Sequence, residues 1–111
     1  MTEFGKLVRD KIPDLILADG RTPVVEVVPA ADLRPALLEK LVEEAAEAAV
    51  ASEQELPEEL ADVVEVVRAL AHGLGLPMEQ IAQLADEKRQ RRGGFDHGLF
   101  LVRVEKARDG G

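Results

Sequence analysis

The sequence contains no cysteine, tryptophan or tyrosine, and phenylalanine occurs only three times among its 111 residues. Without cysteine, neither a disulfide framework nor thiol chemistry is available. With so few aromatic residues, the hydrophobic content of 46% predicts an interior packed from Ala, Val and Leu side chains. A chain of this length predicts a single domain, residues 1–111, with a modest core that we expect a homodimer or higher homo-oligomer to complete.

Long apolar runs and an excess of basic residues are also missing. No apolar run approaches the length of a membrane span, and the N-terminus lacks the apolar region of a signal peptide, so we expect no membrane association and a cytoplasmic location. Twenty-two acidic residues outnumber 14 basic ones, for a net charge of −8. This balance argues against binding a nucleic-acid polymer, which requires clustered Lys and Arg. It leaves a nucleotide possible, because a metal ion and a few local cations suffice for its phosphates.

Apolar residues recur at helical spacing over most of the chain and predict a mainly α fold, an antiparallel helical bundle. The predicted helices run from an N-cap at Asp10 to Gly20, over 33–52 after an N-cap at Asp32, over 57–73, and over 77–91. Two segments rich in β-branched residues, 22–29 and 99–105, instead predict strands. We expect them to pair as a small antiparallel two-stranded β ribbon near the two ends of the chain.

The stretch from Lys40 to Asp62 is the most informative part of the sequence. Glu44 and Glu47 lie three residues apart on one predicted helix, and Glu59 and Asp62 lie three apart on the next. Residues at this spacing share one helix face. If the two helices fold back antiparallel, with axes about 8–10 Å apart, four carboxylates can meet at one place.

Clustered carboxylates repel one another unless a cation lies between them, and oxygen ligands suit a hard cation such as Mg²⁺ or Mn²⁺. The alternative is that all four acids are solvated surface residues, the usual position of ionised side chains. The repeated spacing on adjacent helices favours the metal site. Glu43 is adjacent to Glu44 but about 100° round the helix, so we do not expect it to share the ligand direction.

The acids also carry a family resemblance. Glu43-Glu44-x-x-Glu47 followed by Glu59-x-x-Asp62 resembles the EExxE…ExxD motif of the MazG-like nucleoside triphosphate pyrophosphohydrolases. The opening KLVRDKIPDLI and the closing RGGF at Arg92–Phe95 resemble the small single-domain branch related to phosphoribosyl-ATP pyrophosphohydrolase. The paired acid motifs are fairly specific, whereas RGGF alone is weak.

The resemblance implies Mg²⁺-dependent hydrolysis of a nucleoside triphosphate between its α and β phosphates, with Glu43 as the base that positions water. It also implies a dimer or higher assembly. Phosphoribosyl-ATP or deoxyuridine triphosphate are alternative substrates for the same acids. From a different class, the chain could be a non-enzymatic helical interaction module whose acids only solvate its surface. Neither the base nor the sugar of a substrate follows from the sequence.

A few cations in this acidic chain are candidates for binding substrate phosphates. One group near the N-terminus consists of Lys6, Arg9 and Lys11. The alternative to phosphate binding is that these three are ordinary solvated surface residues. Lys88 and Arg92 prolong the apolar face of the last predicted helix, and their alternative is to cover the edge of the core with their aliphatic stems. Phe95 either stacks on a nucleotide base or belongs to the core.

Overall fold

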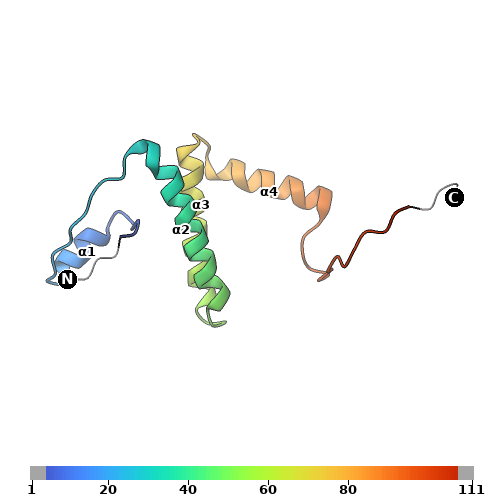
Figure 1. Cartoon of the computed structure of the whole chain (residues 1–111), viewed down its shortest axis with the longest axis horizontal. Coiled ribbons are helices and arrows are strands. Elements are labelled where there is room, and N and C mark those ends of the chain that lie inside the picture. Colours follow the sequence, from blue (N-terminus) through green and yellow to red (C-terminus); the bar gives the residue numbers. More distant parts are fainter. Residues whose placement is uncertain (1–4, 108–111) are drawn as a thin grey trace. The chain divides into compact units, whose positions relative to one another are not determined.

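A computed structural model describes residues 5–107 of the chain (Figure 1). The regular structure within this range consists of helices α1 (Ile12–Ala18), α2 (Ala30–Val50), α3 (Leu56–Gly73) and α4 (Met78–Arg92). The mainly α fold predicted from the sequence is therefore confirmed. Contacts divide the chain into two compact units, Met1–Met78 and Glu79–Gly111. That the whole chain forms one domain stays a prediction.

Helices α2 and α3 pack against each other as a hairpin in the first unit (Figure 1). The connection between them is short, and it is held by Ser52, whose hydroxyl oxygen accepts a hydrogen bond of 3.2 Å from the backbone N–H of Glu55. Pro57 lies in the first turn of α3, where its missing N–H leaves no helical bond unmade. This turn places the second half of α2 beside the first half of α3, the two segments that contain the predicted metal ligands.

The end of α3 is formed by a backbone motif that requires glycine. Gly75 has a φ of +73°, the left-handed region that other residues adopt only with strain. The backbone N–H of Gly75 donates to the carbonyl of His72, and that of Leu76 donates to the carbonyl of Ala71, both at 2.9 Å. These bonds satisfy the last carbonyls of the helix and end it, as in a Schellman motif. Helices α3 and α4 each begin and end within one residue of the predicted spans.

The two N-terminal helices begin differently from the prediction. Helix α1 starts at Ile12 after Lys11, with no side-chain cap, so the prediction of Asp10 as N-cap was wrong. Helix α2 starts at Ala30 after Pro29, which puts Asp32 inside the first turn and not at the N-cap. A carboxylate in that turn still favours the helix electrostatically, because the backbone dipole is positive there. The acidic residue at the start of α2 was therefore recognised from the sequence, but it was placed at the N-cap instead of inside the first turn.

The predicted two-stranded β ribbon is not seen. Within residues 5–107, neither 22–29 nor 99–105 forms a strand. Most of their apolar side chains are exposed to solvent: Val24 and Val27 are 89% and 94% exposed, and Leu99 and Val104 are 90% and 82% exposed. β-Branched composition favours extended backbone, but a strand also needs a partner and a surface to cover, and a lone two-stranded ribbon has too little of either.

The apolar core of the described residues is small. Its buried apolar residues are Leu37 on α2 and Val66 and Ala71 on α3, the two helices that pack against each other. A hairpin of two helices encloses only the seam between them, so most of the apolar residues on the outer faces stay accessible. None of the helices within residues 5–107 combines the length and the apolar composition that a membrane crossing requires.

Candidate metal centre

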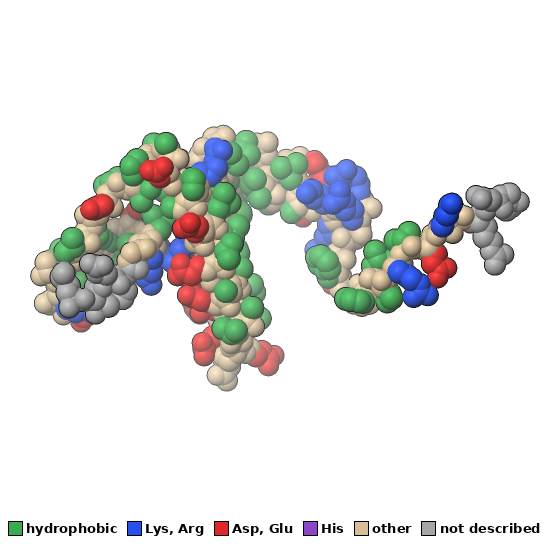
Figure 2. Space-filling view, viewed as in Figure 1, with side chains coloured by type: hydrophobic (Ala, Val, Ile, Leu, Met, Phe, Trp, Pro, Cys, Tyr) green, Lys and Arg blue, Asp and Glu red, His purple; other side chains and the backbone are tan. Residues whose placement is uncertain are grey.

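Five acidic side chains come together on the α2–α3 hairpin, and Figure 2 shows acidic groups gathered along it. One group consists of Glu43, Glu44 and Glu47, and the other of Glu44, Glu59 and Asp62. Within each group, one carboxylate oxygen of each residue lies within 4.8 Å of the others. Glu44 belongs to both groups and connects them. The structure thus brings Glu44 together with Glu47 in one group and with Glu59 and Asp62 in the other, and it adds Glu43 to the first group.

Glu44 is enclosed by the packing of α2 against α3 and is only 7% exposed. Its Oε2 atom is buried without a hydrogen-bond partner, and so is Oε2 of Glu59. A buried carboxylate oxygen that lacks a partner is destabilising, because it has lost water and gained nothing in return. A cation that contacts both residues would offset their charges, and Glu44 and Glu59 each have a carboxylate oxygen within 4.8 Å of the other's. Since every donor is a carboxylate oxygen, the cluster fits a hard ion such as Mg²⁺ or Mn²⁺.

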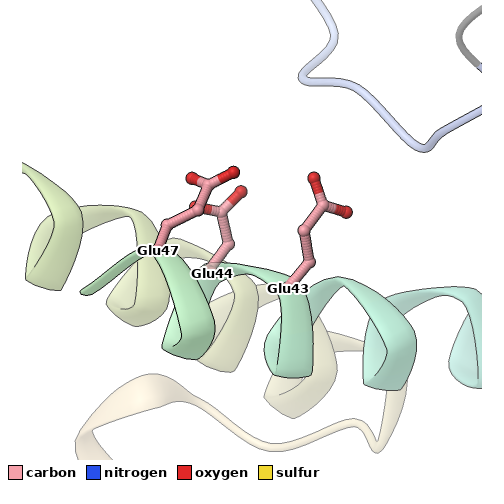
Figure 3. A group of neighbouring side chains, drawn as sticks. All are labelled: Glu43, Glu44 and Glu47. Atoms are coloured by element: carbon pink, nitrogen blue, oxygen red, sulfur yellow. The ribbon is translucent and has the colours of Figure 1, made fainter. Parts of the chain in front are cut away.

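Glu43 was not expected to share the direction of the other acids, and the structure corrects this. Figure 3 shows the Glu43 side chain extending on the same side of α2 as those of Glu44 and Glu47. The offset of about 100° between neighbouring residues applies to the Cα–Cβ bonds, and the length of a glutamate side chain compensates for it. Glu43 keeps 40% of its side chain exposed, so water can reach its carboxylate.

Glu47 lies at the exposed edge of the cluster. Repulsion by Glu44 raises the pKa of Glu47 above its ordinary value of 4.5, and desolvation adds to the effect. Glu59 and Glu43 contribute in the same direction. The acids lie close enough to oppose one another's ionisation, and a divalent cation would relieve this repulsion.

Lys40 is part of the cluster, and the sequence reasoning missed it. Its ammonium nitrogen lies 3.2 Å from Oε1 of Glu44 and 3.3 Å from Oε1 of Glu43. Burial lowers the pKa of Lys40, but hydrogen bonds to Glu44 and Glu43 and the attraction of their charges together outweigh this effect, and the pKa is raised from its ordinary value of 10.5. The signal was present in the sequence, because a Lys four residues before a Glu shares its helix face.

Arg9 approaches the cluster from the segment before α1. Its guanidinium group donates a hydrogen bond of 2.6 Å to Oδ1 of Asp62. The sequence suggested that Arg9 either binds substrate phosphate or is solvated, and the structure pairs it with a predicted metal ligand. Both side chains are well exposed, at 57% and 41%, so solvent screens the pair and its contribution to stability is small.

The other predicted substrate-binding residues are exposed. Lys6 and Lys11 lie at the surface of the first unit. In the second unit, Lys88 and Arg92 are exposed on α4, where Figure 2 shows basic side chains gathered at the C-terminal end. Phe95, which follows the turn at Gly93, is 98% exposed, so a position in the core is excluded for the unit as described.

Comparison with known proteins leaves the family open. No protein-family model matches the chain, and no solved structure is similar to it. An uncharacterised protein of Mycolicibacterium smegmatis is 50% identical over 44 residues, a match that covers 40% of this chain and 45% of the relative. The chain therefore spans less than half the length of that relative.

Proposed function

We propose that this protein is a Mg²⁺-dependent nucleoside triphosphate pyrophosphohydrolase of the MazG-like type, acting in the cytoplasm. The observation that supports it most is Glu44, a buried carboxylate shared by two groups of acids with one oxygen left without a partner. Surface acids that only aid solubility have no reason to be buried in this way. Mn²⁺ is a possible substitute for Mg²⁺, because its ligand preferences are the same.

The proposed reaction uses the acids in two roles. Glu44, Glu47, Glu59 and Asp62 would hold the cation, which when bound would offset the phosphate charge and make water a better nucleophile. The exposed carboxylate of Glu43 positions that water and accepts its proton. The water oxygen forms a bond to the α phosphorus as the bond to the oxygen bridging to the β phosphorus breaks, and the products are a nucleoside monophosphate and pyrophosphate.

A substrate screen tests this proposal. The protein is incubated with Mg²⁺ and nucleoside triphosphates that differ in base, sugar and damage, with phosphoribosyl-ATP included, and pyrophosphate release is measured. Release that requires the metal and stops with a chelator supports the proposal, and the preferred substrate identifies the branch. If no compound in the panel is hydrolysed and Mg²⁺ does not change the melting temperature, the chain is a non-enzymatic module.

We propose that Lys88 and Arg92, which are exposed on α4, bind the phosphates of the substrate. We expect Lys88→Ala to fold and bind Mg²⁺ normally while kcat/KM falls on the order of 10- to 150-fold, the effect of losing one charge-assisted hydrogen bond of about 1.5–3 kcal/mol. Arg92→Ala is expected to behave similarly, and Phe95→Ala to raise KM through lost stacking on the base. Steady-state kinetics measures these values. Unchanged kinetics in both cation variants would return Lys88 and Arg92 to the solvated surface.

A second copy of the chain is proposed to cover the outside of the hairpin and complete a helical bundle. Leu38 and Val42 on α2, and Leu60 and Val64 on α3, are 44–70% exposed. At a spacing of four residues, each pair forms a short apolar stripe. We expect Val42→Asp to shift the protein towards monomer in sedimentation experiments, and Val50→Asp, at the end of α2, to have no such effect. A monomeric wild type at all concentrations would refute the assembly.

A further inference from the structure

The enclosed cation beside the acids is the feature that neither the motif nor the proposed reaction explains. Lys40 lies one turn before Glu43 and Glu44 on α2, and only 18% of its side chain is exposed. Its ammonium group contacts one oxygen of each, at 3.3 Å and 3.2 Å. A lysine normally keeps its strongly hydrated charge in water, so burying it here requires an attraction that compensates for lost hydration.

Glu44 divides its two oxygens between this lysine and the rest of the cluster. Oε1 accepts the contact from Lys40, whereas the buried Oε2 has no partner. Glu59, on the opposite helix, also has a buried oxygen without a partner. The carboxylate of Glu44 therefore has one oxygen neutralised by the protein itself and another available for a cation between α2 and α3. The ammonium group and such a cation would therefore contact the two oxygens of the same carboxylate.

The other cation at the cluster differs in its surroundings. Arg9 pairs with Asp62, but both side chains are accessible to water, which screens their charges. The Lys40–Glu44 pair is much more enclosed, so its charges act on their neighbours with less screening. Of these two residues, Lys40 is the one whose positive charge is less screened by water.

We propose that Lys40 is a resident counter-ion of the acid cluster and that its ammonium group competes with the divalent cation for Glu44. The inference rests on the proposed metal site. A charge of +1 at about 5 Å from a charge of +2 weakens binding on the order of 10-fold even at the dielectric constant of water, and more where water is partly excluded. Glu44 is buried where α2 packs on α3, so we expect its carboxylate to stay in place when Lys40 is removed. The loss of repulsion between Lys40 and the metal ion then determines the change in affinity.

This arrangement has a consequence for substrate binding. Before a metal binds, Lys40 offsets part of the repulsion among the acids. The same charge keeps the affinity for a free metal ion low, so the site fills mainly when phosphate oxygens of a nucleotide complete the coordination of the ion. The lysine thereby favours binding of the metal together with the triphosphate over binding of the metal alone.

Metal affinity in the absence of nucleotide tests the inference. Mn²⁺ binding is measured by the loss of the free-ion spin-resonance signal, and Mg²⁺ binding by the shift in melting temperature. The proteins compared are the wild type, Lys40→Met, Lys40→Gln and Lys40→Arg. We expect the Met and Gln variants to melt lower without metal and to bind Mn²⁺ about 10-fold more tightly, and Lys40→Arg to match the wild type. If Lys40→Met does not fold, Lys40→Gln decides the comparison.

Arg68→Gln is the matched control. Arg68 forms an exposed ion pair with Glu65 at three-residue spacing on α3, and its loss changes the net charge by the same amount. We expect it to leave Mn²⁺ affinity unchanged. Equal or weaker Mn²⁺ binding in Lys40→Met and Lys40→Gln, with binding intact in the wild type, would overturn the counter-ion role and leave the metal site standing. Absence of binding in every variant would overturn the metal site and the inference together.

Discussion

Glu44→Gln is expected to keep the fold and to lose most of the stabilisation that Mg²⁺ gives the wild type. Glutamine has the size and shape of glutamate, so the packing of α2 on α3 is preserved. Its neutral amide lacks the charge that attracts a divalent cation, and Glu44 is the residue that both groups of acids share. Removing it therefore divides the cluster into parts that cannot surround an ion.

The size of this effect follows from mass action. At a metal concentration 100 times the dissociation constant, binding stabilises the folded state by about 2.7 kcal/mol, and the variant is expected to lose most of that increment. Thermal melting with and without Mg²⁺ measures it, with Glu58→Gln, an exposed acid in the first turn of α3, as the control. Equal Mg²⁺ stabilisation of wild type and Glu44→Gln would place the ion elsewhere.

The same variant makes a prediction about pH in the absence of metal. A carboxyl group whose pKa is raised on folding contributes stability at low pH, and that contribution is lost as the pH rises through the raised value. Glu47 has such a pKa, and Glu44 is its largest cause, so metal-free wild type is expected to lose stability as the pH rises above 4.5. Glu44→Gln should lose less. Parallel profiles of melting temperature against pH in the two proteins would show that Glu44 is not the cause of the raised pKa of Glu47.

Glu43→Gln is expected to lower the rate of pyrophosphate release on the order of 10²- to 10⁴-fold, the usual contribution of a general base. Its amide can still accept a hydrogen bond but cannot take a proton from water. Glu43 is partly exposed and is proposed as the base, whereas the buried Glu44 is proposed as a metal ligand. The variant should therefore retain most of the rise in melting temperature that the metal causes.

Glu39→Gln is the matched control for this experiment, because Glu39 lies one turn before Glu43 on α2 and is exposed. It is expected to leave both the rate and the metal effect unchanged. Loss of the Mg²⁺ effect in Glu43→Gln, together with its activity, would make Glu43 a metal ligand and not the base. That outcome is possible geometrically, because its carboxylate lies within reach of those of Glu44 and Glu47.

The ends of helices could be predicted well where a single residue determines the local backbone conformation. Pro57 and Gly75 act through their own backbone, so the ends of α3 could be predicted to within one residue. The ribbon could not be predicted in this way. A β-branched composition describes what 22–29 and 99–105 favour locally, whereas pairing depends on surfaces elsewhere in the molecule.

The candidate site shows the same division. The spacing of Glu44 with Glu47, and of Glu59 with Asp62, determined from the sequence alone that each helix presents two acids on one face. The helical period also put Lys40 on the face of Glu44. Only the tertiary structure decided that Glu44 is the buried member, that Lys40 is enclosed beside it, and that Arg9 reaches Asp62 from 53 residues away. Burial and long-range pairing depend on how α2 packs on α3, and no local period contains that information.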